Sequence, residues 1–441
     1  MTHTARGTGR DLVCQLAYGR GEVPLHLPRE SLAGIVRPRT PARVPATAAD
    51  ELELVRAAVA APIGTPRLRD LAAGAGSAAV VVSDVTRPCP TYRFLEAVLD
   101  ELAALDAARV SILFALGSHR RHTDDERRRL VGDVAFERYP CLDLDEDDCV
   151  LVGHTSRGTP LEVFRPYVES DLTVCTGNLE YHYFAGYSGG AKAVMPGICR
   201  RSAIQPNHSM MLEEGARAGV LRGNPVRDDI DEAGGIVGVD FIVNVLLDEK
   251  KRVVDAVAGH YLEAHAEGVR RYDALFDARI DEPVDVVVAS PGGHPKDINL
   301  YQAQKTLDNV AGAVRDGGTI VLVAACPEGF GEATFAEWMA DMGDPAAVIA
   351  RIRREFVLGG HKAAAIAGLL ARASVSLVSA FPDEVVRAMG MTPFASADDA
   401  AAAALAHAGP GARCLVVPFG SRVTAAGGTG RPAAAPAPLR G

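Results

Sequence analysis

The chain has 441 residues, of which 48% are hydrophobic and 23% charged, a composition typical of a soluble globular protein. Its 46 Lys and Arg residues face 56 Asp and Glu residues, a net charge of −10, which argues against a partner such as nucleic acid. No apolar stretch reaches the roughly 18 residues of a membrane-spanning helix, and the amino terminus has no apolar signal core. We therefore predict a cytoplasmic protein that contacts no membrane.

The eight cysteines are scattered along the chain and form no Cys-x-x-Cys pair. This spacing disfavours both a disulfide framework and a zinc ribbon. Most of the thiols are expected to be small buried side chains.

Short β-branched runs that end in polar or glycine-rich turns predict buried parallel strands. These runs are 79–83, 110–116, 172–176, 284–289, 319–324, 375–380 and 414–417. Segments with helical periodicity lie between many of them, at 92–105, 124–131, 299–314 and 344–356. The alternation predicts open α/β sheets, in which ligands bind beyond the carboxyl ends of the strands.

A domain boundary is predicted where the polar helical stretch 261–276 runs into Ile280-Asp-Glu-Pro, before a new strand begins. We predict two Rossmann-like α/β domains, 1–265 and 280–420, with the active site in the cleft between them. Residues 421–441 are rich in Ala, Gly and Pro without periodicity, which predicts a disordered tail.

The first candidate site is Asp84-Val-Thr86-Arg87-Pro-Cys-Pro, directly after a predicted strand. A carboxylate, a hydroxyl and a guanidinium follow the strand end, and two prolines restrict the turn, as a site that orients an arginine requires. The alternative is a helix N-cap, in which Asp84 or Thr86 binds backbone amides.

The second candidate is His119, which follows the next strand in Gly-Ser-His-Arg. A histidine in this position is either structural or an acid/base group. We expect His122 to lie on the surface, and Thr123 with Glu126 to form a capping box at a helix start.

The third candidate is the segment 176–197, in which 22 residues include five glycines and four aromatic residues. The glycine-rich part contains Gly186, Ser188, Gly189 and Gly190, whose backbone amides can surround a phosphate, and Lys192 adds a cation. It is not a Walker A loop, because no Ser or Thr follows the lysine. Plain turns are the alternative interpretation of these glycines.

The fourth candidate is a strand, a glycine-rich turn and a helix over 289–305. Tyr301, Gln302 and Lys305 fall on one helical face, opposite an apolar stripe. They form either a solvated face or a group that points into the cleft between the domains. His294 and the pair His361-Lys362 lie in glycine-bounded turns, where a structural role is favoured.

Taken in order, these motifs resemble those of the lactate racemase family. They are Asp-x-Thr-Arg-Pro-x-Pro, Gly-x-His-Arg, Glu-x-His with Ala-Gly-Tyr-Ser-Gly-Gly-x-Lys, and Asn-Leu-Tyr-Gln-x-x-Lys, which together extend over residues 84–305. The resemblance implies an isomerase, a racemase or epimerase of a lactate-like 2-hydroxy acid. It also implies a covalently attached nickel-pincer nucleotide, the Ni(II) pyridinium-3-thioamide-5-thiocarboxylic acid mononucleotide, and hence, indirectly, the enzymes that synthesise it.

The resemblance further implies a role for each matching residue. Lys192 matches the lysine that is joined to the cofactor as a thioamide, His208 matches the protein ligand of nickel, and His119 and His182 match the paired acid/base histidines. Arg87, Tyr301, Gln302 and Lys305 match residues that orient the substrate, and Asp84, Thr86, Gly186, Ser188, Gly189 and Gly190 are expected to contribute to cofactor binding in the first domain.

The implied chemistry suits these residue types. Removing a hydride from a 2-hydroxy acid is easier than removing its weakly acidic α-proton, provided that an acceptor is present. The hydroxyl proton then needs an imidazole base, and each of the two faces needs its own.

Two alternatives stay open. A nicotinamide-dependent α/β dehydrogenase is disfavoured because no Gly-x-Gly-x-x-Gly motif follows a strand with an acidic residue about 20 positions on. A non-catalytic carrier of the pincer nucleotide would need Lys192 and His208 but neither His119 nor His182.

Overall fold

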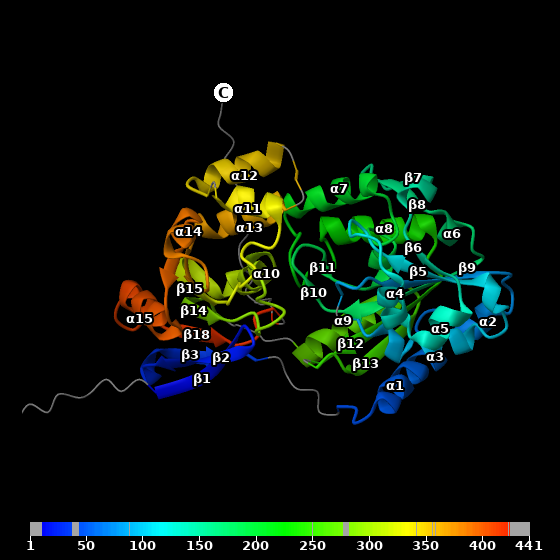
Figure 1. Cartoon of the computed structure of the whole chain (residues 1–441), viewed down its shortest axis with the longest axis horizontal. Helices are drawn as coiled ribbons and strands as arrows, with labels where there is room; N and C mark the ends of the chain where they lie inside the picture. The colour runs from blue at the N-terminus through cyan, green and yellow to red at the C-terminus, as the bar shows by residue number, and fades with distance from the viewer. Residues whose placement is uncertain are drawn as a thin grey trace, which may run out of the picture. The chain divides into compact units, whose positions relative to one another are not determined.

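The computed structural model describes residues 11–37, 44–87, 89–248, 250–276, 282–340, 342–354, 356–357, 359–421 and 423. The chain forms two compact units, each built around a six-stranded sheet (Figure 1). The central unit is Thr40–Leu275, and the terminal unit combines Met1–Arg39 with Phe276–Gly441. Among the described residues, none of the helices combines the length and apolar character needed to span a bilayer.

The sheet of the central unit has the strand order β13-β12-β9-β4-β5-β6. Its strands are β4 (Ala78–Ser83), β5 (Val110–Ala115), β6 (Cys141–Asp143), β9 (Leu172–Leu179), β12 (Phe241–Leu247) and β13 (Val253–Gly259). All neighbours are parallel except β12 and β13. The chain passes from β4 to β5 and β6 on one side and returns to β9 on the other. Open α/β sheets bind ligands where the strand order reverses in this way, and Asp84 and Glu180 directly follow β4 and β9.

Helices and two hairpins complete the central unit. The helices are α1 (Ala48–Ala60), α2 (Leu68–Ala72), α3 (Leu95–Glu101), α4 (Asp124–Val131), α5 (Asp133–Arg138), α6 (Arg165–Val168), α7 (Arg201–Ser209), α8 (Pro225–Val237) and α9 (Glu263–Phe276). The hairpins pair β7 (Cys149–His154) with β8 (Pro160–Phe164), and β10 (Tyr181–His182) with β11 (Gly186–Tyr187). Helix α8 begins where sequence rules favour it, with Asn224 as the N-cap and a proline in the first turn.

The sheet of the terminal unit is entirely parallel, in the order β17-β16-β15-β14-β18-β3. Its strands are β3 (Leu32–Ile35), β14 (Val284–Ala289), β15 (Val314–Val323), β16 (Ser374–Val378), β17 (Thr392–Phe394) and β18 (Cys414–Val417). A hairpin of β1 (Asp11–Tyr18) and β2 (Gly21–Leu27) joins them, with helices α10 (Leu300–Val310), α11 (Ala333–Ala340), α12 (Pro345–Arg354), α13 (Gly360–Leu370), α14 (Asp383–Ala388) and α15 (Ala397–Ala408).

Side chains alternate across this second sheet and so form two cores. Val287 and Leu322 pack in one cluster with residues of α10, α11 and α13. Val286 and Val288 face the opposite side, against the β1–β2 hairpin and α15. The strand order reverses between β14 and β18, and α10 is the first helix after β14.

The α/β class and all seven predicted strands are confirmed, as is the capping box at Thr123. The predicted helix 92–105 is shorter, a 3₁₀ turn followed by α3. The helix predicted over 299–314 ends at Val310, and β15 begins at Val314. Strands β3, β6, β12, β13 and β17 of the two sheets, and the three hairpins, are additional to the predicted ones.

The predicted division into 1–265 and 280–420 differs from the structure at the start of the chain. Strand β3 pairs with β18, and Leu16 and Leu25 of the hairpin are completely buried against the terminal sheet. The first 39 residues therefore belong to the terminal unit. Of the predicted disordered tail, all but Ser421 and Val423 lies outside the described residues.

Candidate active site

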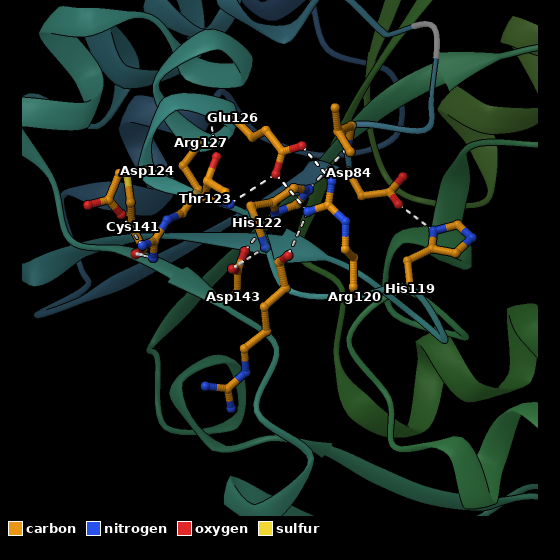
Figure 2. A network of polar contacts seen from close by, with 12 residues as sticks. Asp84, His119, Arg120, His122, Thr123, Asp124, Glu126, Arg127, Cys141 and Asp143 are labelled. Carbon is orange, nitrogen blue, oxygen red and sulfur yellow. Dashed lines mark hydrogen bonds and ion pairs between the residues drawn. The ribbon is translucent and has the colours of Figure 1, made fainter.

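The turn after β4 brings Asp84 against His119. The Asp84 carboxylate is buried, contacts His119 Nδ1, and accepts a hydrogen bond from Thr86 Oγ1 at 2.9 Å (Figure 2). Arg87 Nε lies 3.7 Å from Asp84 Oδ1. Burial by itself would raise the pKa of Asp84, but the hydrogen bond from His119 and the charge of Arg87 outweigh it and hold the pKa below its usual value. The carboxylate binds side chains here and is not the N-cap of a helix.

The contact with Asp84 fixes how His119 carries its proton. An ionised carboxylate only accepts hydrogen bonds, so Nδ1 of His119 must be the donor. The lone pair of the neutral ring is then on Nε2, and the side chain is 39% exposed. A carboxylate that holds an imidazole in this tautomer is the arrangement of a general base and its orienting group.

His122 is buried, so the predicted surface position is wrong (Figure 2). Its Nδ1 lies 2.7 Å from Asp143 Oδ1, and its Nε2 accepts a hydrogen bond from the Val85 amide at 3.2 Å. The ring also meets Phe114 edge-on. His122 therefore fixes the backbone between Asp84 and Thr86.

The glycine-rich segment after β9 is bonded within the chain. Ser188 Oγ donates to the Asn178 carbonyl at 2.9 Å and accepts from the Glu180 amide at 2.8 Å. The Ser188 amide donates to the Glu180 carbonyl, and the Gly190 amide donates to Asn244 Oδ1 at 2.8 Å. The groups of Ser188 and Gly190 that were expected to surround a phosphate are thus already engaged.

Two glycines of this segment are required by close approach. Gly186 has φ 75°, and a Cβ there would lie 2.0 Å from the Val220 carbonyl oxygen. Gly189 has φ 78°, and a Cβ there would lie 2.6 Å from Asn244 Oδ1. Only glycine satisfies both the positive φ and the lack of space.

Helix α8 supports the segment from one side. Arg227, whose side chain is completely buried, donates hydrogen bonds to the carbonyls of Ala185 and Gly189 at 3.4 Å each, and to that of Tyr187. Asn224, at the start of the same helix, donates to the Phe184 carbonyl at 2.8 Å. Neither residue lies in a motif that stands out in the sequence. Their local sequence signal is limited to Asn224 as a helix-capping residue and to Arg227 as a charged residue beside the apolar positions of α8.

Helix α9 contributes a second set of contacts. His265 Nε2 donates to the Ser188 carbonyl at 2.8 Å, and the Asp273 carboxylate accepts from the hydroxyls of Tyr187 and Tyr181. Burial, together with the charge of Arg227, lowers the pKa of His265 to about 3. This ring is therefore neutral at physiological pH, with its proton on the nitrogen that binds Ser188.

Lys192 lies in the 3₁₀ turn Gly190–Ala193 and is half-buried. Burial and the nearby charges of Arg87 and Arg227 lower the pKa of its amine well below the ordinary lysine value. A lowered pKa increases the unprotonated, nucleophilic fraction of a lysine amine at a given pH.

His182 and His208 both contact the ring of Phe184. The ring centroids lie 4.6 Å from Phe184 for His182 and 4.9 Å for His208. His182 Nδ1 accepts the Ala185 amide at 3.2 Å, which puts the proton of the neutral ring on Nε2. His119 and His182 are therefore held in opposite tautomers.

In the terminal unit, α10 presents the predicted group at its start. Asn299 caps the helix, and Lys305 Nζ donates to Gln302 Oε1 at 3.0 Å. Lys362 Nζ lies 3.7 Å from the ring centre of Tyr301 and donates to the Tyr301 carbonyl. Burial and the charge of Lys305 lower the pKa of Lys362 well below the lysine value. Lys362 was expected in a turn and is instead buried in the first turn of α13, where it supports Tyr301.

No cluster of three or more His, Cys, Asp or Glu side chains suited to a metal ion occurs in the part of the chain that the structure describes. His208 thus belongs to no such three-residue cluster among these residues. All eight cysteines are free thiols, and burial raises the pKa of Cys89 to about 12.

Comparisons with known proteins agree along nearly the whole chain. Residues 18–219 match the family model of the lactate racemase N-terminal domain, and residues 280–425 match that of the lactate racemase C-terminal domain. The chain is 34% identical over 390 residues to a lactate racemase of Thermoanaerobacterium thermosaccharolyticum, covering 86% of this chain and 91% of that protein. It is 31% identical to a lactate racemase of Lactiplantibacillus plantarum, covering 84% and 90%.

The structural comparison gives the same result. The structure of the lactate racemase apoprotein from Thermoanaerobacterium thermosaccharolyticum superposes with a TM-score of 0.85 at 32% identity, covering 93% of this chain and 98% of that one. The two chains therefore share a fold over almost their full lengths.

Replacing Arg227 by Met should strongly destabilise the central unit. The carbonyls of Ala185, Tyr187 and Gly189 each lose a hydrogen bond from a charged donor, at a cost of about 3 kcal/mol or more in the free energy of unfolding. Urea unfolding of the variant measures this loss. Arg270→Met, on the exposed face of α9, is the matched control and should change the midpoint little. Equal effects of the two variants would contradict this account of Arg227.

The lowered pKa of His265 should make stability fall in acid. Between the unfolded histidine value of roughly 6.5 and about 3, the unfolded state binds one more proton than the folded state. The free energy of unfolding should then decrease by up to about 1.4 kcal/mol per pH unit on acidification. His265→Gln, which keeps a donor for Ser188, should reduce this slope. Urea unfolding from about pH 7 to about pH 5 tests it, and identical slopes for both proteins would refute it.

Proposed function

Since the chain belongs to the lactate racemase family, and is thereby an isomerase of the racemase type, we propose that it interconverts the antipodes of a 2-hydroxy acid. The observation that carries the proposal is the Asp84–His119 pair at the reversal point of the central sheet. It provides a base of fixed tautomer where an open α/β sheet binds its ligand.

We further propose that the cofactor is the nickel-pincer nucleotide, for which two residues of the central unit are suited. Lys192 carries an amine of lowered pKa, as covalent attachment through a thioamide needs. His208 offers an imidazole, a ligand that nickel accepts. When bound, the group would supply the acceptor and donor of the hydride at the substrate's α-carbon.

His119 is proposed as the base for one antipode. Its Nε2 carries the lone pair, so it can take the hydroxyl proton as the 2-hydroxy acid becomes a 2-keto acid. The Asp84 carboxylate stabilises the imidazolium that results, and Thr86 keeps the carboxylate in place. We therefore assign Asp84 and Thr86 to the orientation of His119, whereas the sequence motif suggested cofactor binding.

His182 is proposed as the acid/base group for the other antipode. Its resting ring directs Nε2–H away from the Ala185 amide that binds Nδ1. With a proton on each nitrogen the ring is an imidazolium, which can return a proton to the keto oxygen. That form requires the contact with Ala185 to open.

Cationic and polar side chains that match the family motifs are proposed to bind the substrate carboxylate and hydroxyl. Arg87 offers a guanidinium that can bind a carboxylate through two parallel hydrogen bonds. Tyr301, Gln302 and Lys305 follow one another along the first turns of α10, and Lys305 is oriented by its bond to Gln302. The enzymes that synthesise the cofactor are proposed as indirect partners.

Co-expression with the pincer-synthesis enzymes tests the proposal directly. The purified chain should show a mass increment and bound nickel, both absent from Lys192→Ala, and should racemise at least one member of a panel of chiral 2-hydroxy acids. Intact-mass spectrometry, nickel analysis and chiral chromatography are the measurements. A chain without increment and nickel, while a known family member loads in the same cells, would refute it.

The histidine variants separate a catalyst from a carrier of the cofactor. His119→Ala and His182→Ala should each retain the mass increment and nickel but lose turnover. Full turnover in either variant would contradict its proposed role. A loaded wild-type chain that turns over no 2-hydroxy acid would favour the carrier.

Asp84→Asn should lower kcat by about 100-fold or more, because the amide no longer requires a donor at His119 Nδ1 and the tautomer is lost. KM should change much less, since Asp84 is not proposed to touch the substrate. Steady-state kinetics of the loaded enzyme measure both constants. Thr86→Val, which removes one hydrogen bond to the same carboxylate, is the milder control. Its kcat should lie between that of the wild type and that of Asp84→Asn.

A further inference from the structure

Asp229 is a buried carboxylate in helix α8 that the proposed mechanism does not use. It is 1% exposed and accepts hydrogen bonds from Thr155 Oγ1 at 2.5 Å, Thr159 Oγ1 at 3.0 Å and Asn207 Nδ2 at 2.8 Å. The two threonines belong to the β7–β8 hairpin and its turn, and Asn207 to α7. The carboxylate thus holds α7 against α8 and the hairpin.

The amide of Asn207 can take only one orientation. The residue is completely buried, and its Nδ2 faces two oxygens, Asp229 Oδ2 and the Val226 carbonyl at 3.3 Å. A backbone carbonyl only accepts, so the opposite orientation would bring Oδ1 against both oxygens without a donor. Oδ1 must therefore face the other way, and there it lies 3.2 Å from His208 Nδ1.

The orientation of Asn207 decides the tautomer of His208. Because Oδ1 is an acceptor, His208 Nδ1 must carry the proton, and the lone pair of the neutral ring is on Nε2. The ring plane is also restricted by Phe184, whose carbonyl binds Asn224 at the start of α8. The buried side chains of Asp229 and Asn207 therefore determine that Nε2 is the nitrogen of His208 that can donate electrons to a metal.

We propose that Asn207, braced by Asp229, is a positioning residue that fixes His208 as the Nδ1–H tautomer and presents Nε2 to the nickel of the cofactor. This inference rests on the proposed function, since it takes nickel as the ligand of His208. Metal-bound histidines generally donate their second N–H to an oxygen, and losing that partner weakens metal binding by roughly 10- to 100-fold. A purely structural network would stabilise α7 but leave the tautomer undetermined.

The tautomer can be measured in the cofactor-free, full-length chain. Ring nitrogen and carbon chemical shifts of isotope-labelled histidines, with His208→Gln to assign the signal, should show Nδ1–H for His208 in the wild type. Asn207→Ala should shift the ring toward Nε2–H. Asn309→Ala removes a comparably buried amide, bonded to the Gly420 carbonyl, and should leave the signal unchanged. If the His208 ring of the wild type were protonated on Nε2, the inference would be overturned. This outcome does not depend on whether a variant of Asn207 folds.

The consequence for the metal is tested on the loaded chain. Under a chelator, Asn207→Ala should lose nickel roughly 10- to 100-fold faster than the wild type, while the mass increment at Lys192 persists. Equal rates of nickel loss from two loaded proteins would overturn this inference alone. A wild type that carries neither increment nor nickel would instead overturn the proposed function, and the ligand assigned to His208 with it.

Discussion

The candidate site depends on one buried guanidinium. Arg227 lies in the centre of the unit, where an isolated charge is very costly, and it is satisfied mainly by carbonyls of the glycine-rich segment. Its carboxylate neighbour Asp231 is 3.3 Å away, and burial raises the pKa of that group despite Arg227. Three of the four groups that bind the guanidinium are nevertheless carbonyls of the segment. The carbonyls can bind the guanidinium only in one backbone conformation. The buried charge of Arg227 therefore also fixes the backbone conformation of the glycine-rich segment.

Helix α8 extends this constraint to the other side of the site. Asn224, Arg227 and Asp229 lie within six residues of its start, and each binds a different neighbour. Asn224 binds Phe184, and Arg227 binds the segment that leads to Lys192. Asp229 binds the helix that carries His208. Buried polar networks of this kind add specificity when every member is satisfied. The same guanidinium also helps to lower the pKa of Lys192 and that of His265, so a single charge acts on both the shape and the protonation of the site.

Protonation in this site is set largely by hydrogen-bond geometry. Asp84 fixes one tautomer of His119, the Ala185 amide fixes the other tautomer of His182, and Asn207 determines that of His208. The tautomers follow from partners that can only accept or only donate. The proposed reaction passes the hydroxyl proton to one imidazole and returns a proton to the keto oxygen from the other, and so requires imidazoles in defined and different states. His119 has its required tautomer in the ligand-free chain, whereas His182 becomes an imidazolium only when its contact with the Ala185 amide opens.

The sequence by itself determined the local features of the protein. β-branched runs and the polar turns after them located seven strands and the strand-end positions of Asp84 and His119, and the order of four motifs indicated the family. The tertiary structure alone decided the partners: Asp143 for His122, Arg227 for Ala185, Asn207 and Asp229 behind His208, and strand β18 for β3. His122 was expected on the surface because nothing near it in the sequence reveals the carboxylate 21 residues on. Periodicity and turn chemistry depend on neighbours along the chain, whereas the partner of a buried polar group depends on which distant segments fold against it.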